Sequence, residues 1–204
     1  MTEYGPTPGT AHIVDDDEAI RDALSWLFKS RGIASSAWPS AEAFLADYRP
    51  QMRGCLVLDI RMEDMSGPEL FDRLRSQGCR MPVIYLTGHG DVPLAVQSLK
   101  NGAFDFIEKP CNDNLLADRV AEALALDAEV NQRASQQASV AERLASLTQR
   151  EREVMDAVLA GKLNKVIAGD LDIAMRTVEV HRARVFEKMG VKSAVELAKL
   201  LAGN

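Results

Sequence analysis

The run Leu56-Val57-Leu58-Asp59 decides the fold, because it is a short apolar stretch that ends at a carboxylate. Three more apolar runs end at a polar or charged side chain: residues 12–14 before Asp15 and Asp16, residues 83–86 before Thr87, and residues 104–107 before Lys109. Such runs are typical of the buried strands of a parallel sheet. Ligands of an open α/β sheet bind just beyond the carboxyl ends of its strands. We therefore expect these carboxylates, the hydroxyl and the ammonium group to share one pocket.

Helix-like segments alternate with these runs between residues 10 and 125. Apolar residues at helical spacing predict a helix over residues 17–31, with Leu24 and Phe28 on its buried stripe. Further helices are expected to begin at Ser40, Ser66, Asp91 and Asn112. Successive strand–helix units predict a five-stranded parallel sheet with helices on both faces, because each right-handed crossover must lie over the sheet.

The pattern changes after residue 125. Residues 126–145 are polar in their second half and lack Gly and Pro, so they are compatible with a helical extension or a flexible tether, and we expect the helix. From residue 146 only helices are expected, the first opened by a capping box at Thr148-Gln149-Arg150-Glu151 and the others near residues 163–171, 174–189 and 193–202. The predicted organisation is an α/β domain over residues 1–125, a linker over 126–145 and a small all-α domain over 146–204.

Charge differs between the two predicted domains. Residues 1–125 carry 12 Lys+Arg and 19 Asp+Glu, a balance of −7, whereas residues 146–204 carry 10 and 8, a balance of +2. This asymmetry indicates two different kinds of partner. The C-terminal excess is too small to establish nucleic-acid binding by charge alone.

Cysteine usage and hydropathy indicate a cytoplasmic protein. Cys55, Cys79 and Cys111 are odd in number and widely spaced, as expected for reduced thiols. No apolar stretch approaches the roughly 18 residues needed to cross a membrane, and the first ten residues do not resemble a secretion signal.

The residues of the expected pocket suit phosphoryl chemistry with a divalent cation. Mg²⁺ prefers oxygen ligands, which Asp15, Asp16 and Asp59 offer. Asp59 is also a candidate nucleophile toward phosphorus, and Thr87 and Lys109 can contact phosphoryl oxygens. The alternative is that each acid merely caps the helix that follows it, but agreement among all four strand ends favours a common site.

Residues 11–125 resemble the receiver domain of a two-component response regulator. The resemblance is carried by Val14-Asp15-Asp16-Asp17, Leu56-Val57-Leu58-Asp59-Ile60-Arg61-Met62, Met65-Ser66-Gly67, Leu86-Thr87-Gly88-His89-Gly90-Asp91 and Phe106-Ile107-Glu108-Lys109-Pro110. It implies a flavodoxin-like fold. Glu63 departs from the pattern, because the family usually has Pro after the Met.

The resemblance also implies a role for each pocket residue. Asp59 would accept a phosphoryl group from a sensor histidine kinase. Mg²⁺ would be held by Asp15, Asp16, Asp59 and the backbone carbonyl of Arg61. Thr87 and Lys109 would bind the phosphoryl group, and Phe106 would be an aromatic switch. Such a protein is a regulator and not an enzyme, apart from its own phosphoryl transfer and dephosphorylation at Asp59.

The C-terminal helices have the pattern of a helix-turn-helix. A short helix, a turn at Asp172-Ile173-Ala174 and a longer helix suit docking in the major groove of DNA. A plain helical bundle with a solvated face remains an alternative on spacing alone. His181 falls beside the apolar seam of Val178 and Val185, which favours a packing role.

Residues 147–198 resemble the LuxR-type helix-turn-helix domain. Apart from residues 1–9 and the linker, the chain is similar to response regulators of the FixJ/NarL type. The matching residues include Leu147-Thr148-Gln149-Arg150-Glu151-Arg152-Glu153-Val154, Asn164-Lys165 and Arg176-Thr177-Val178-Glu179-Val180-His181-Arg182. The resemblance implies that Lys165, Arg176 and Thr177 contact DNA phosphates, and that Glu179, Val180 and Arg182 face base edges. Ala174 stands where Ser is common, so the longer helix is expected to lack a side-chain N-cap.

The implied partners are the histidine kinase, double-stranded DNA and a second copy of the phosphorylated chain. RNA polymerase is a further candidate partner by the same resemblance, which implies no membrane. The two rival classes are a small-molecule phosphatase and a pure interaction adaptor. A small-molecule phosphatase would commonly carry a second Asp two residues after the nucleophile, where this chain has Arg61. A pure interaction adaptor would lack affinity for DNA.

Overall fold

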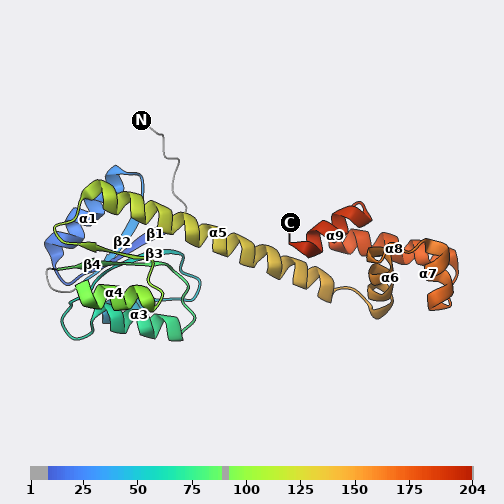
Figure 1. Ribbon diagram of the computed structural model, residues 1–204, viewed down its shortest axis with the longest axis horizontal. Helices are drawn as coiled ribbons and strands as arrows, with labels where there is room; N and C mark the ends of the chain where they lie inside the picture. The colour runs from blue at the N-terminus through green and yellow to red at the C-terminus, as the bar shows by residue number, and fades with distance from the viewer. Residues whose placement is uncertain (1–8, 89–91, 204) are drawn as a thin grey trace. The chain divides into compact units, whose positions relative to one another are not determined.

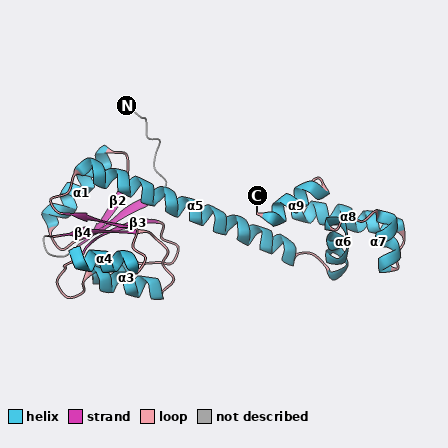
Figure 2. Cartoon of the chain, in the orientation of Figure 1, coloured by secondary structure: helices cyan, strands magenta, loops and turns pink. Residues whose placement is uncertain are grey.

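The computed structural model describes residues 9–88 and 92–203 (Figure 1). They form two compact units, one ending at Asn131 and the other beginning at Gln132. The elements of the first unit are β1 (Thr10–Val14), α1 (Glu18–Ser30), β2 (Ala34–Trp38), α2 (Ala41–Asp47), β3 (Gly54–Asp59), α3 (Gly67–Ser76), β4 (Val83–Thr87), α4 (Val92–Lys100) and β5 (Asp105–Glu108). Then come α5 (Asp113–Ala145), α6 (Gln149–Leu159), α7 (Asn164–Leu171), α8 (Met175–Met189) and α9 (Ala194–Ala202). Figure 2 shows all strands of the described residues in the first unit.

The five strands are parallel and lie in the order β2-β1-β3-β4-β5. Val14 pairs with Leu58, Asp59 pairs with Leu86, and Thr87 pairs with Glu108. This register brings the carboxyl ends of β1, β3, β4 and β5 to one edge of the sheet. The predicted α/β fold followed by a helical C-terminal part is confirmed.

Helices cover both faces of the sheet. Helices α1 and α5 lie over one face, and α3 and α4 lie over the other (Figure 1). On the first face, Leu24 and Phe28 of α1 pack in one core cluster with Leu116 and Val120 of α5. Alternate strand residues enter the two clusters, because successive side chains of a strand point to opposite faces.

The second strand has no counterpart among the apolar runs of the sequence. Strand β2 reads Ala-Ser-Ser-Ala-Trp and lies at the edge of the sheet, where its residues are exposed or half-buried. An edge strand pairs along one side only, so it needs no continuous apolar run.

The expected helix starts are confirmed where they are described. Side chains of Asp17, Ser40, Ser66 and Asn112 each accept a hydrogen bond from a backbone N–H in the first turn of the following helix. The start expected at Asp91 lies outside the described residues. Helix α5 continues through the whole of residues 126–145.

The second unit has its own core. One cluster gathers Leu147, Met155, Val185, Met189 and Leu197, and another gathers Val154, Val158, Ile167 and Val178. The predicted capping box is present, with Thr148 and Glu151 each accepting from the other's backbone N–H. Of the described helices, none combines the length and the apolarity that a membrane crossing needs.

Candidate functional site

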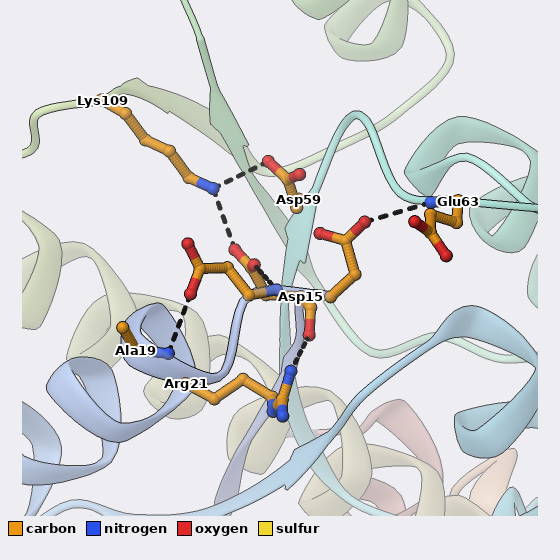
Figure 3. Close-up of polar contacts among 8 residues, drawn as sticks. Asp15, Ala19, Arg21, Asp59, Glu63 and Lys109 are labelled. Atoms are coloured by element: carbon orange, nitrogen blue, oxygen red, sulfur yellow. Dashed lines mark hydrogen bonds and ion pairs between the residues drawn. The ribbon is translucent and has the colours of Figure 1, made fainter.

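The strand ends bring their polar side chains together, as the sequence predicts (Figure 3). The Lys109 ammonium lies 2.9 Å from Asp15 Oδ2 and 2.9 Å from Asp59 Oδ1. Lys109 is held at this edge because its backbone N–H donates to the Thr87 carbonyl across 2.7 Å. The Lys109 ammonium therefore bridges the carboxylate of Asp15, which follows β1, and that of Asp59, the last residue of β3.

Three carboxylates surround this edge of the sheet. Each of Asp15, Asp16 and Asp59 has an oxygen within 4.8 Å of the oxygens of the other two. Asp15 and Asp59 are buried, and Asp16 is exposed. The Asp15 carboxylate also accepts from the Asp17 N–H across 2.9 Å. Clustered oxygens with one open side fit a hard divalent cation that keeps some of its waters.

The electrostatics of the pocket are those of charges held close together with little water. Burial raises the pKa of Asp59, and repulsion by Asp15 and Asp16 adds to the rise, while the hydrogen bond from Lys109 opposes it. Burial by itself would lower the pKa of Lys109, but the hydrogen bonds to Asp15 and Asp59 leave that pKa above its ordinary value. A divalent cation would relieve the repulsion between the carboxylates.

Thr87 and Phe106 lie on the neighbouring strands β4 and β5. Thr87 is fully buried, and its hydroxyl has no hydrogen-bond partner among the described residues. Phe106 is half-buried against the core cluster on the α3 side of the sheet. A buried hydroxyl without a partner is costly, so Thr87 is available to a ligand that brings an acceptor.

The loop after Asp59 lies beside the same pocket. Ile60 and Met65 anchor it in the core, while Arg61, Glu63 and Asp64 are exposed. The Glu63 N–H donates to Asp16 Oδ2 across 3.1 Å. The departure at Glu63 is visible in the sequence, but this contact is not, because it is made by the backbone.

The predicted DNA-contact residues lie on α7 and α8. Lys165, Arg176, Thr177, Glu179 and Val180 are exposed. The turn before α8 has Asp172 at a φ of 52°, and the start of α8 at Ala174 has no side-chain cap, as expected. His181 is half-buried.

Arg182 differs from the other predicted contact residues because it is half-buried and engaged within the unit. Its Nη1 donates to Asn164 Oδ1 across 3.0 Å, and its guanidinium lies over the Phe186 ring at 5.3 Å. Neither Asn164 nor Phe186 is predicted from the sequence to hold Arg182 in this way. The spacing of Phe186 from Arg182, one helical turn, was the available signal.

Comparisons with known proteins cover nearly the whole chain. Residues 11–121 match the family model described as "Response regulator receiver domain", and residues 145–201 match "Bacterial regulatory proteins, luxR family". The "C4-dicarboxylate transport transcriptional regulatory protein DctR" of Rhodobacter capsulatus is 54% identical over 94% of this chain and 98% of its own. The "Transcriptional regulatory protein FixJ" of Rhizobium meliloti is 47% identical over 100% and 98%.

Solved structures agree with this assignment. The response regulator StyR superposes with a TM-score of 0.90 at 38% identity and covers 97% of this chain and 100% of its own. Full-length FixJ from B. japonicum has a TM-score of 0.61 at 41% identity, covering 97% of each chain. DctR and FixJ are named as transcriptional regulatory proteins, and the family model of the C-terminal part describes bacterial regulatory proteins. The chain therefore belongs to the two-component response regulators that join a receiver domain to a LuxR-type DNA-binding domain.

Proposed function

We propose that Asp59 accepts a phosphoryl group from a sensor histidine kinase and that its phosphorylation controls DNA binding by the C-terminal domain. The observation that carries the proposal is the Lys109 ammonium bridging Asp15 and Asp59 at the carboxyl edge of the sheet. An Asp59 oxygen would form the new bond to phosphorus as the bond between phosphorus and the kinase histidine breaks.

The surrounding residues divide the remaining work. Mg²⁺ would be held by Asp15, Asp16, Asp59 and the backbone carbonyl of Arg61, and when bound it neutralises charge on the phosphoryl oxygens. Lys109 would move its hydrogen bond from the Asp59 carboxylate to a phosphoryl oxygen. The unpartnered hydroxyl of Thr87 supports its assignment as a second phosphoryl donor. The regulator would also lose this group by hydrolysis at Asp59.

The output would pass from the pocket to the surface of the first unit. Movement of Thr87 toward the phosphoryl group would leave room for Phe106 to turn inward. We assign to this change the exposure of a surface through which two phosphorylated chains dimerise. Two linked DNA-binding domains then share one site, which raises affinity without new contacts per domain.

In the C-terminal domain, α8 would enter the major groove. Lys165, Arg176 and Thr177 would contact phosphates, and Glu179, Val180 and Arg182 would face base edges. Five of these six side chains are exposed, which supports the assignment. Arg182 would reach DNA by exchanging its contact with Asn164 for a base or a phosphate.

The proposed organisation assigns residues 1–125 to the receiver, 126–145 to the linker within α5, and 146–204 to the DNA-binding domain. A regulator of this kind works in the cytoplasm, where its DNA lies. RNA polymerase would be a further partner at the promoter.

Labelling of Asp59 tests the proposal. Incubation with a small acyl phosphate and Mg²⁺ is expected to add one phosphoryl group, detected by intact mass, and Asp59→Asn is expected to abolish the addition. Asp64→Asn is the matched control, because it changes an exposed acid of the same loop. Stoichiometric, Mg²⁺-dependent labelling that survives in Asp59→Asn would overturn the assignment.

A further inference from the structure

The loop between β3 and α3 is fixed at both ends. The Ile60 N–H donates to the Leu86 carbonyl across 3.1 Å, and the Gly67 N–H donates to the Ile60 carbonyl across 3.1 Å. At its far end, Ser66 and Glu69 form a capping box at the start of α3. The course of the exposed residues between these anchors is therefore restrained, so a backbone group on the loop can hold a defined position.

The Glu63 N–H is such a group, and it donates a hydrogen bond to Asp16. The Glu63 nitrogen lies 3.1 Å from Asp16 Oδ2, and Figure 3 draws this bond at the labelled Glu63. The next residue, Asp64, has a φ of 34°, a left-handed backbone that Asp tolerates better than most residues. The Glu63 side chain itself is exposed, so the contact with Asp16 is made by the backbone.

Asp16 differs in its surroundings from the other two carboxylates. Asp15 and Asp59 are buried and hydrogen-bonded to Lys109, whereas Asp16 is exposed on the open side of the cluster. An exposed carboxylate samples several rotamers unless a partner orients it. A hydrogen bond to one of its oxygens leaves the other for a cation, and such outer partners of metal ligands strengthen binding by restricting the ligand.

We infer that Glu63 is a positioning residue for the cation site: its backbone N–H orients the Asp16 carboxylate, and its side-chain carboxylate adds attraction for the cation. This inference rests on the proposed function, because it assumes that Asp16 helps to hold Mg²⁺. The two contributions are separable. Every residue except proline supplies the N–H, and proline is the residue that the family usually carries here. Only an acidic residue supplies the charge.

Three variants at position 63 separate the two contributions. Glu63→Gln and Glu63→Ala keep the N–H and remove the charge, while Glu63→Pro removes both. Mg²⁺ affinity of the full chain is measured by calorimetric titration with MgCl₂, without a phosphoryl donor, at low salt and at about 0.5 M salt, where exposed charges are screened.

We expect Glu63→Gln and Glu63→Ala to bind Mg²⁺ slightly more weakly than wild type at low salt and equally well at high salt. Glu63→Pro is expected to bind about tenfold more weakly at both salt concentrations, the usual effect of losing an outer partner of a metal ligand. Equal affinity of Glu63→Pro and Glu63→Gln would overturn the role of the N–H. Wild-type affinity of Glu63→Gln at low salt would overturn the role of the charge.

A second measurement does not depend on how the loop tolerates proline. The amide proton of Glu63 is followed by NMR in wild type and in Asp16→Ala, without metal. A hydrogen-bonded amide is expected to resonate downfield and to exchange more slowly in wild type, and both properties are expected to be lost in Asp16→Ala. An unchanged amide would contradict the contact.

The failure of this inference is distinguishable from the failure of the proposed function. If the pocket does not bind Mg²⁺, neither wild type nor Asp59→Asn shows a saturable heat of binding in the titration with MgCl₂. If only the inference fails, wild type binds Mg²⁺, Asp59→Asn binds it more weakly, and the variants at position 63 behave alike.

Discussion

At the scale of single residues, the charged side chains around Asp59 are grouped at a cost in folding stability. Asp15, Asp16 and Asp59 lie close together, and Lys109 is the cation that bridges two of them. Burial and the neighbouring acids raise the pKa of Asp59, so its ionised form is less favourable in the folded chain than in the unfolded one. Sites with such perturbed groups are commonly functional.

Asp59→Asn should therefore stabilise the metal-free chain at neutral pH. A raised folded pKa costs nothing where Asp59 is protonated in both states, and the cost grows as pH rises above the ordinary pKa of 3.8. We expect a gain on the order of 1 kcal/mol at pH 7, the scale of one partly screened charge interaction, that vanishes near pH 3. Urea unfolding in EDTA measures it, and a destabilised Asp59→Asn at pH 7 would contradict this view of the pocket.

Among the proposed DNA-contact residues, Arg182 is the one whose side chain contacts other side chains without DNA. Its guanidinium is held by Asn164 and Phe186. Arg182→Ala is expected to weaken DNA binding by about 1–3 kcal/mol. A phosphate contact predicts a salt dependence flatter by about one unit of slope, and a base contact predicts weaker discrimination between sequences. Lys199→Ala, an exposed lysine of α9, is the control. An Arg182→Ala variant with unchanged affinity, slope and discrimination would remove Arg182 from the interface.

At the scale of helices, α8 begins without a side-chain cap. Ala174 has the extended backbone of an N-cap residue, with φ −67° and ψ 145°, but no side-chain acceptor. Ala174→Ser supplies a hydroxyl for a free N–H of the first turn and is expected to stabilise the second unit by about 1 kcal/mol. Thermal unfolding measures the gain. If Ala174→Ser unfolds at the same temperature as wild type, these N–H groups already have hydrogen-bond partners in wild type.

Helices α6 and α8 are joined by an ion pair that should make the second unit sensitive to acid. Lys188 Nζ lies 2.7 Å from Glu151 Oε2, and Glu151 is 2% exposed. The hydrogen bond from Lys188, with those from Thr148, lowers the pKa of Glu151 to about 2 from an ordinary 4.5. A lowered folded pKa contributes stability that is complete above the ordinary pKa and is lost as pH falls toward the folded one.

Lys188→Met should consequently destabilise the second unit by about 1–2 kcal/mol at pH 7, because it leaves a buried carboxylate without its cation. The difference from wild type should shrink as pH falls from about 4.5 to about 2. Unfolding followed by circular dichroism across this range gives both values, with Lys199→Met as the control. A difference that does not vary with pH would mean that Lys188 acts through packing alone.

Sequence patterns predicted the elements whose signals are local. The caps at Asp17, Ser40, Ser66 and Thr148 each depend on residues within one helical turn. No apolar run marks strand β2 in the sequence, because this edge strand has exposed and half-buried residues. The sequence left residues 126–145 compatible with either a helix or a flexible tether. Their polar second half buries little surface, so the spacing of apolar residues does not distinguish the two.

At the scale of the whole molecule, the sequence predicted which residues meet better than how they meet. Parallel strands must bring their carboxyl ends to one edge, so the grouping of Asp15, Asp59, Thr87 and Lys109 followed from the order of the runs. The contacts of Glu63 with Asp16 and of Asn164 with Arg182 depend on loop course and on side-chain reach. Neither is encoded in spacing along the chain.

The two units also differ in what they can bind. The first carries the negative balance and the acidic pocket around Asp59, and the second is mildly positive with a helix-turn-helix. So small a positive charge predicts weak binding by one copy. Under the proposed function, phosphorylation would raise DNA occupancy by increasing the number of copies that bind together.

The most direct test of that control is the DNA affinity of the full chain with and without acyl phosphate and Mg²⁺, at fixed salt. Fluorescence anisotropy is measured on a duplex enriched from a random pool by the phosphorylated chain. Wild type is expected to bind about 10²-fold more tightly after phosphorylation, through avidity, and Asp59→Asn is expected to show no gain. Equal affinity of wild type with and without acyl phosphate, or an equal gain in Asp59→Asn, would contradict the claim that phosphorylation of Asp59 controls DNA binding.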